Sequence, residues 1–119
     1  MGRLTTHVLD TMAGGPAAGV AIELWTVGAP GEDARCIRTA VTNADGRTGE
    51  PLLEGDAFAA GRYELRFRAG DYLRARHGID AEPLFLDEIP VRFGIADPGQ
   101  HFHVPLLLSA YGYSTYRGS

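Results

Sequence analysis

Short runs of alternating apolar and polar residues, separated by turns rich in glycine and proline, constrain the fold of this chain more than any other feature. The clearest run is residues 62–68, in which Tyr63, Leu65 and Phe67 alternate with four charged side chains. A period of two places the apolar residues on one face and the charged residues on the other, as in a half-buried β-strand. Sixteen glycines and seven prolines punctuate the sequence, so we predict many short strands.

Six other segments show a similar alternation or strand composition and are expected to form strands. They are residues 4–9, 19–27, 36–42, 88–95, 101–109 and 111–116. Residues 71–78 differ, because an aspartate suited to cap a helix is followed by good helix formers and a final glycine. We predict a two-turn helix there, with His77 at the surface beside its C-terminus. Residues 10–18 and 28–35 are expected to be loops.

Seven or eight short strands with one short helix indicate an all-β fold in which two antiparallel sheets pack as a sandwich. The chain has 119 residues, of which 45% are hydrophobic, which is enough for one core and too little for two. Residues 1–119 are therefore expected to form a single domain without an internal repeat or linker.

The charge balance argues against several classes of partner. The formal net charge is −4 and the sequence pI is about 5.5, whereas proteins that bind nucleic acid or anionic membranes usually present a basic surface. No apolar run approaches the roughly 20 residues that span a bilayer, and the N-terminal sequence lacks an apolar leader, so we expect a cytoplasmic protein. The single Cys36 cannot form an internal disulfide, and the absence of lysine excludes Schiff-base chemistry.

Three of the four histidines lie in predicted strands, and their phase indicates what they face. His101 and His103 share one face of their strand, while the alternate residues are apolar and point to the core. His7 shares its face with Thr5 in the same way. Three such histidines also permit a zinc site, but the 101–109 strand carries no carboxylate to orient the ligands. We therefore expect neither a metal nor another cofactor.

Arg47 and the C-terminal segment offer further polar groups. Arg47 follows a tight Asp-Gly turn, and its guanidinium is either solvated or faces the histidines as a fixed cation that binds an anionic ligand. Residues 111–119 keep a strand-like aromatic pattern almost to the last residue, so the tail is a candidate to dock and bring Ser119 to a site. The sequence contains no Gly-x-Ser-x-Gly elbow and no glycine-rich phosphate loop.

Three stretches of the sequence resemble the transthyretin-like family. They are Leu-Thr-Thr-His-Val-Leu-Asp at 4–10, Thr-Asn-Ala-Asp-Gly-Arg-Thr at 42–48, and His-Phe-His-Val-Pro-Leu-Leu-Leu-Ser at 101–109 leading to Tyr-Ser-Thr-Tyr-Arg-Gly-Ser at 113–119. The terminal Tyr-Arg-Gly-Ser resembles the 5-hydroxyisourate hydrolases of the family rather than its hormone carriers. Phe102 stands where the family often has Tyr, and Ala110 where it often has Pro.

The resemblance implies an eight-stranded β-sandwich with one short helix, in agreement with the strand pattern. It also implies a homotetramer, a dimer of dimers whose subunits pair edge to edge, with the active sites in a channel at the dimer–dimer interface. By the same resemblance the catalytic residues are His7, Arg47, His103 and Ser119, and Tyr116 joins His7 and Arg47 in binding the substrate. His101 is then a structural neighbour of the site.

The activity that the resemblance implies is hydrolysis of 5-hydroxyisourate, the product of urate oxidation, in purine breakdown. Water opens the six-membered ring without a metal and gives 2-oxo-4-hydroxy-4-carboxy-5-ureidoimidazoline. Two imidazoles, a guanidinium and a hydroxyl suit this reaction, which needs an activated water, stabilisation of the carbonyl oxygen and a proton for the leaving nitrogen. The sequence leaves open which histidine is the base. The alternative function is a non-enzymatic carrier of a small ligand in the same channel.

Overall fold

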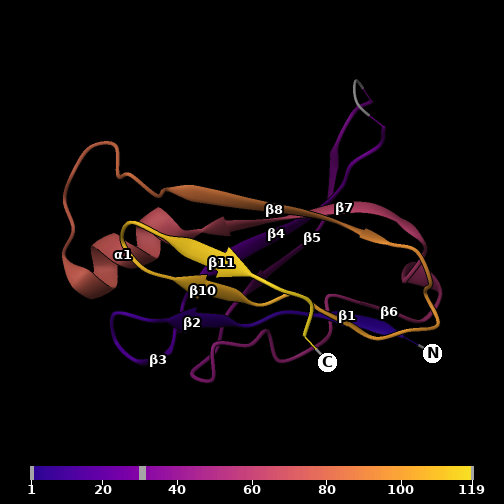
Figure 1. Cartoon of the computed structure of the whole chain (residues 1–119), viewed down its shortest axis with the longest axis horizontal. Helices are drawn as coiled ribbons and strands as arrows, with labels where there is room; N and C mark the ends of the chain where they lie inside the picture. The colour runs from indigo at the N-terminus through magenta and orange to yellow at the C-terminus, as the bar shows by residue number, and fades with distance from the viewer. Residues whose placement is uncertain (1, 30–31, 119) are drawn as a thin grey trace.

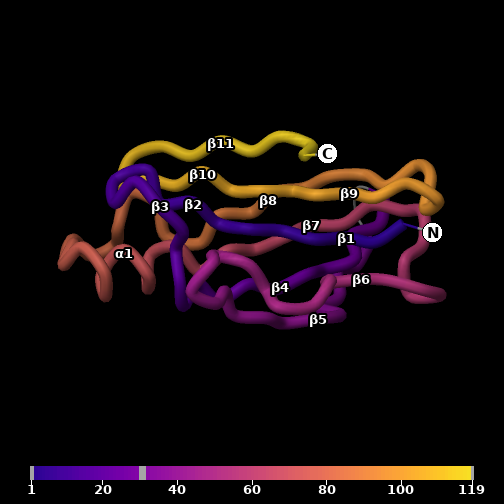
Figure 2. The backbone as a smooth tube through the Cα atoms, turned by 90° about the horizontal axis from the view of Figure 1, so that it is seen from below, coloured from indigo at the N-terminus to yellow at the C-terminus, as the bar shows by residue number. Residues whose placement is uncertain are grey.

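The computed structural model describes residues 2–29 and 32–118, which form two layers of strands with an α-helix at one end (Figure 1, Figure 2). One layer is a four-stranded antiparallel sheet in the order β5-β4-β7-β8. Its strands are β4 (Ala21–Thr26), β5 (Arg35–Val41), β7 (Gly61–Arg68) and β8 (Glu88–Ile95). β7 and β8 pair along their whole length, whereas the pairing of β4 with β5 shifts register between Leu24 and Trp25.

The second layer consists of two small sheets, β6-β1-β9 and β11-β10-β2-β3. Their strands are β1 (Arg3–Thr5), β2 (Val8–Asp10), β3 (Gly15–Pro16), β6 (Leu53–Glu54), β9 (Phe102–His103), β10 (Leu106–Leu108) and β11 (Tyr113–Thr115); a single 3-10 turn, η1 (Gly55–Ala57), follows β6. Hydrogen bonds from Val104 N to Thr5 O at 3.0 Å and from Leu106 N to His7 O at 2.9 Å join the two sheets. Residues 3–10 and 102–108 therefore run side by side through the centre of one continuous layer.

The strand prediction is confirmed in outline and needs correction in three places. The described residues contain eleven strands, because the segments 4–9 and 101–109 each divide into two. The structure also places β3 in the predicted loop 10–18 and adds β6, which the sequence pattern does not predict. Finally, β1 pairs with β9 and β2 with β10 in parallel, so the sandwich is not wholly antiparallel. Alternation specifies the face of each residue but not the direction of the neighbouring strand.

The core lies between the layers and confirms the predicted phase of the strands. Leu4 and Val8 from the second layer meet Leu65 and Phe67 of β7, and all four side chains have 0% exposure. Burying each such side chain stabilises the fold by about 1.5–3 kcal/mol. The intervening residues of β1, β2, β9 and β10 point to the outer face of the second layer, where the predicted site residues lie.

The helix α1 (Ala69–His77) confirms the predicted helix, although it begins at Ala69 rather than at Asp71. Arg68 takes the N-cap position without a side-chain hydrogen bond, because β7 continues directly into the helix. The helix ends at Gly78, whose φ of 65° lies in the left-handed region that glycine adopts without strain. None of the helices in the described part of the chain is long and apolar enough to cross a membrane.

His77 lies at the C-terminal end of α1 as predicted, but its side chain is only 15% exposed and contacts Asp10. Its Nε2 lies 2.6 Å from Oδ2 of Asp10, a carboxylate at the end of β2 whose side chain is 1% exposed. The Tyr72 hydroxyl donates to the same oxygen at 2.5 Å, and the backbone N–H groups of Met12 and Ala13 donate to Oδ1. Burial by itself raises the pKa of Asp10, but the hydrogen bonds outweigh burial and hold this pKa below its ordinary value of 3.8.

We expect Asp10→Ala to lower the free energy of unfolding by about 2–4 kcal/mol, because the Tyr72 hydroxyl and the backbone N–H groups of the turn lose a buried acceptor. The lowered pKa means that the charged carboxylate stabilises the fold above the pKa of the unfolded chain, about 3.9, and that this contribution is lost as the pH falls through the folded pKa. Urea unfolding measures both effects, and the difference between the two proteins should shrink as the pH is lowered below about 4.

Asp33→Ala is the matched control, because Asp33 is exposed and its removal should change the free energy of unfolding by less than about 0.5 kcal/mol. Equal urea midpoints for the wild type and Asp10→Ala at neutral pH would show that this carboxylate does not hold the helix to the sandwich.

Candidate active site

The predicted catalytic histidines come from the two central strands of the second layer. β1 and β9 pair in parallel with Thr5 opposite His103, and His7 follows between β1 and β2. Because side chains alternate along a strand, Thr5 and His7 point to the same outer face as His101 and His103. The parallel register therefore brings together imidazoles that lie 96 residues apart in the sequence.

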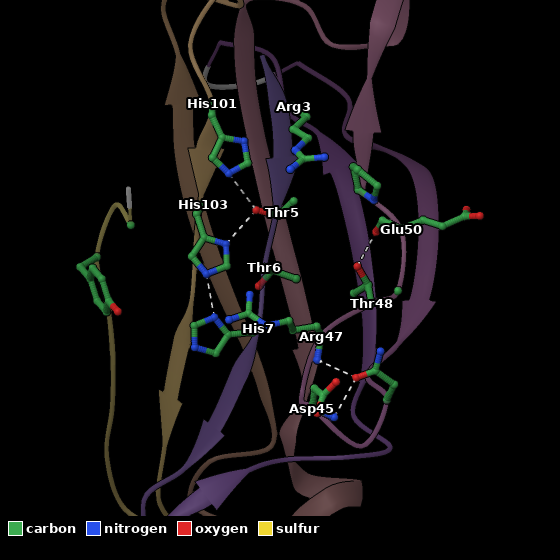
Figure 3. A pocket seen from close by; sticks show the side chains of 15 residues that line it. Arg3, Thr5, Thr6, His7, Asp45, Arg47, Thr48, Glu50, His101 and His103 are labelled. Carbon is green, nitrogen blue, oxygen red and sulfur yellow. Dashed lines mark hydrogen bonds between the residues drawn. The ribbon is translucent and has the colours of Figure 1, made fainter. Parts of the chain in front are cut away.

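Two of these imidazoles form a hydrogen-bonded pair. Nδ1 of His7 lies 2.7 Å from Nε2 of His103, and the two rings are stacked with their centroids 4.8 Å apart (Figure 3). The Thr5 hydroxyl continues the contact on the other side, with Oγ1 2.8 Å from Nδ1 of His103 and 3.3 Å from Nε2 of His101. Both ring nitrogens of His103 are thus occupied by protein partners.

Arg47 reaches the histidine pair because a tight turn returns the chain to β2. The Asn43 side chain accepts hydrogen bonds from the backbone N–H of Asp45 and of Arg47, and Gly46 O accepts from Val8 N at 2.8 Å. Gly46 has a φ of 74°, and a Cβ there would lie 2.5 Å from the Val8 carbonyl oxygen, so only glycine fits. The turn forms an antiparallel bridge between Arg47 and His7, which places the guanidinium beside the His7 ring (Figure 3).

The surroundings of the pair keep both imidazoles neutral at physiological pH. Burial, followed by the positive charge of Arg47, lowers the pKa of His7 below 6.5. Burial also lowers the pKa of His103 to about 4, with further contributions from His7, Arg47 and His101. A neutral imidazole can take a proton from water, and a nearby fixed cation can stabilise a developing negative charge, so the arrangement suits hydrolytic chemistry.

The C-terminal segment docks against the histidine strand, as the sequence indicates. Gly118 N donates to His103 O at 2.7 Å, and a Cβ at this glycine would lie 2.7 Å from the His103 ring. The Arg117 guanidinium donates to Gln100 Oε1 and to the His101 carbonyl, and it stacks on the Phe102 ring at 4.0 Å. These contacts fix the tail at the edge of the site. Ser119, the predicted catalytic hydroxyl, lies outside the described residues.

A polar cavity of about 650 Å³ opens in front of the histidine pair. Its lining includes His7, Arg47, His103 and Tyr116, which are the predicted site residues that the structure describes, and also His101. Nothing among residues 2–29 and 32–118 gathers three or more His, Cys, Asp or Glu side chains in a way that could hold a metal ion. The cavity therefore offers imidazoles and a guanidinium to a small polar molecule.

Several lining residues were not predicted as site residues, and Arg3 and Thr5 are two of them. Arg3 and Thr5 lie on the same face as His7, and the Thr5 hydroxyl contacts both His101 and His103 (Figure 3). The alternation of side chains along a strand could have identified both residues, because Thr5 and Arg3 lie two and four positions before His7 and therefore share its face. Their neighbours across the sheet depend on the long-range pairing of β1 with β9, which the pattern does not specify.

The architecture and the site together define a transthyretin-like β-sandwich that carries a histidine–arginine cluster on one face. The chain belongs to the HIUase/Transthyretin family, whose model matches residues 4–118. A 5-hydroxyisourate hydrolase of Rhizobium meliloti (strain 1021) is 58% identical over 118 residues, which make up 99% of this chain and 97% of the relative.

Solved structures agree with this assignment. A 5-hydroxyisourate hydrolase of Klebsiella pneumoniae is 36% identical with a TM-score of 0.79, and the match covers 100% of both chains. The crystal structure of an (S)-allantoin synthase is 47% identical with a TM-score of 0.90 over 99% of this chain, which spans less than half, 44%, of that longer chain. Sea bream transthyretin in complex with thyroxine is 30% identical with a TM-score of 0.83, covering 98% of this chain and 94% of the transthyretin.

We expect Arg47→Gln to raise the pKa of His7, because the substitution removes the cation that disfavours protonation of this ring. In the wild type, both His7 and His103 should titrate below 6.5, and the acid shift of His103 should become smaller in the variant. Nuclear magnetic resonance of the imidazole 15N nuclei over a pH series measures these pKa values directly.

Arg62→Gln on β7 is the control for this titration, because it removes an exposed guanidinium from the other layer. It should leave both histidine pKa values unchanged. Identical His7 titrations in the wild type and in Arg47→Gln would contradict the electrostatic role of Arg47.

Proposed function

We propose that the protein hydrolyses 5-hydroxyisourate, opening its six-membered ring to 2-oxo-4-hydroxy-4-carboxy-5-ureidoimidazoline in urate breakdown. The observation that carries this proposal is the pair of neutral imidazoles, His7 and His103, held beside Arg47 at a polar cavity. Support also comes from full-length relatives that are named 5-hydroxyisourate hydrolases. The reaction needs a water, a base for it and a cation near the carbonyl oxygen, and the described residues supply the base and the cation.

His7 is the general base in this proposal. Both ring nitrogens of His103 have protein partners, whereas Nε2 of His7 has none among the residues that the structure describes. That nitrogen belongs to a residue lining the cavity, and the lowered pKa of His7 keeps it unprotonated at neutral pH. His103 holds the His7 ring through the 2.7 Å hydrogen bond and thereby fixes the direction of the free nitrogen.

The reaction follows from these roles. Nε2 of His7 takes one proton from a water while the water oxygen bonds to the ring carbonyl carbon, and negative charge develops on the carbonyl oxygen. The Arg47 guanidinium stabilises that charge. The carbon–nitrogen bond then breaks, the ring nitrogen receives the proton held by His7, and the new carboxylic acid ionises to a carboxylate. Tyr116 lines the cavity and contacts the substrate in this proposal, and Ser119 orders the attacking water or His7.

The alternative function is a carrier for a small ligand, of the kind represented by sea bream transthyretin in its complex with thyroxine. The lining of the cavity favours the enzyme, because it combines His7, Arg47 and His103 with hydroxyls and carboxylates rather than an apolar wall. A large apolar ligand would have to bury these polar groups without partners, which costs about 1–3 kcal/mol for each.

We further propose that the chain assembles as a homotetramer, a dimer of dimers whose dimer–dimer interface encloses the sites. The support is that the cavity lies on the outer face of the second layer and that Tyr116, an aromatic residue that lines it, is 55% exposed. Sedimentation equilibrium should then give four times the chain mass of 12.8 kDa. The cytoplasmic location stays a prediction.

We expect His7→Ala, Arg47→Gln and His103→Ala each to lower kcat/KM by about 100-fold or more, because each removes the base, the cation or the group that orients the base. The substrate decays spontaneously, so the measurement is the loss of freshly made 5-hydroxyisourate by ultraviolet absorbance above the protein-free rate. Arg62→Gln is the control and should retain the wild-type rate. Wild-type rates in all three site variants would contradict the assignment of this cavity.

The docking of the C-terminal tail against His103 leads to a separate prediction. Deleting residues 117–119 removes the contacts of Arg117 with Gln100 and His101 and the backbone bond of Gly118 to His103. We expect kcat/KM to fall by about 100-fold or more while the urea midpoint changes little, because Arg117 is exposed and Gly118 has no side chain. Deleting Ser119 alone separates its hydroxyl from the docking of the tail. Full activity of the longer deletion would rule out a role for the tail.

A further inference from the structure

A single hydroxyl, that of Thr5, lies between two imidazoles behind the proposed base. Oγ1 of Thr5 is 2.8 Å from Nδ1 of His103 and 3.3 Å from Nε2 of His101 (Figure 3). His103 in turn contacts His7 through its other nitrogen at 2.7 Å. The four groups therefore form one unbranched chain of hydrogen bonds from His101 through Thr5 and His103 to His7, and all four residues line the cavity.

The number of available hydrogens limits which of the four groups donates and which accepts in each hydrogen bond. A hydroxyl carries one hydrogen, so Thr5 can donate to only one of the two imidazoles and accepts a hydrogen bond from the other. A neutral imidazole likewise carries one N–H, so His103 donates through one nitrogen and accepts through the other. When Thr5 donates to one imidazole and accepts from the other, all the hydrogen bonds point in the same direction, either from His101 towards His7 or from His7 towards His101.

We propose that Thr5 is a positioning residue that holds His103 as its Nδ1–H tautomer and links it to His101, so that His7, His103, Thr5 and His101 form a proton relay. The inference rests on the proposed function, since only the order from His7 towards His101 leaves Nε2 of His7 without a hydrogen and able to act as a base. In this order His7 Nδ1–H donates to His103 Nε2, His103 Nδ1–H donates to Thr5 Oγ1, and Thr5 donates to Nε2 of His101.

In each half of the reaction, one proton crosses every hydrogen bond of the relay. When Nε2 of His7 takes a proton from water, the Nδ1 proton of His7 passes to His103 Nε2 and the Nδ1 proton of His103 passes to Thr5. The Thr5 proton passes to Nε2 of His101, which leaves the positive charge on His101. When the carbon–nitrogen bond breaks, each transfer reverses and His7 gives the original proton to the leaving ring nitrogen. Charge and proton number are conserved throughout.

Thr5→Val tests the relay in the kinetics, because valine keeps the branched shape of threonine and removes only the hydroxyl. We expect kcat to fall at least about tenfold with KM nearly unchanged, and Thr5→Ser to restore most of the rate. His101→Phe should lower kcat to a similar extent, and the double variant should be no slower than either single one because both changes break the same chain. Thr11→Val is the control, since Thr11 donates to the Leu108 carbonyl outside the cavity.

The 15N resonances of the His103 ring in the free protein test the tautomer without any substrate. We expect the Nδ1–H form in the wild type and in Thr5→Ser, and the Nε2–H form in Thr5→Val, because Nδ1–H would then face a methyl group. An Nε2–H tautomer in the wild type, or additive losses in Thr5→Val and His101→Phe, would overturn the relay while leaving hydrolysis intact. Absence of hydrolysis by a wild type with the Nδ1–H form would instead refute the proposed function.

Discussion

The site depends on the hydrogen bond between His7 and His103 and on the parallel strand register that makes it possible. Thr5 lies opposite His103 across β1 and β9, and this register brings Nδ1 of His7 to 2.7 Å from Nε2 of His103 on the outer face of the layer. A shift of the register by one residue would turn one of these rings into the core and bring apolar side chains to the surface. The buried residues Leu4 and Val8 oppose such a shift, so core packing and site geometry are set by the same strand pairing.

Three other features act on that pair. The turn at Gly46 carries Arg47 to the His7 ring, which lowers the pKa of His7 and supplies a cation where negative charge develops. The tail closes over the opposite side through Gly118. Thr5 fills the remaining position on His103 and connects it to His101. Each feature contacts His7 or His103, and Nε2 of His7 has no hydrogen-bond partner among the described residues.

Much of this arrangement could be predicted from the sequence, because alternation in a strand fixes which residues share a face. This alternation predicted that His101 and His103 lie opposite the core residues and that His7 and Thr5 share a face, and the structure confirms both predictions. The parallel pairing of strands distant in the sequence left no local signal, so the contacts of Thr5 were not predicted. The contact of His77 with Asp10 was not predicted for a related reason, since the two residues lie 67 positions apart in the sequence.

The pH dependence of kcat/KM for 5-hydroxyisourate, measured above the spontaneous decay at each pH, tests the central claim most directly. A water-activating His7 held neutral by burial and by Arg47 predicts a rate that rises as one group loses its proton below pH 6.5 and is level through neutral pH. An acid limb centred at or above 6.5, or no acceleration at any pH, would contradict a base of this kind at His7.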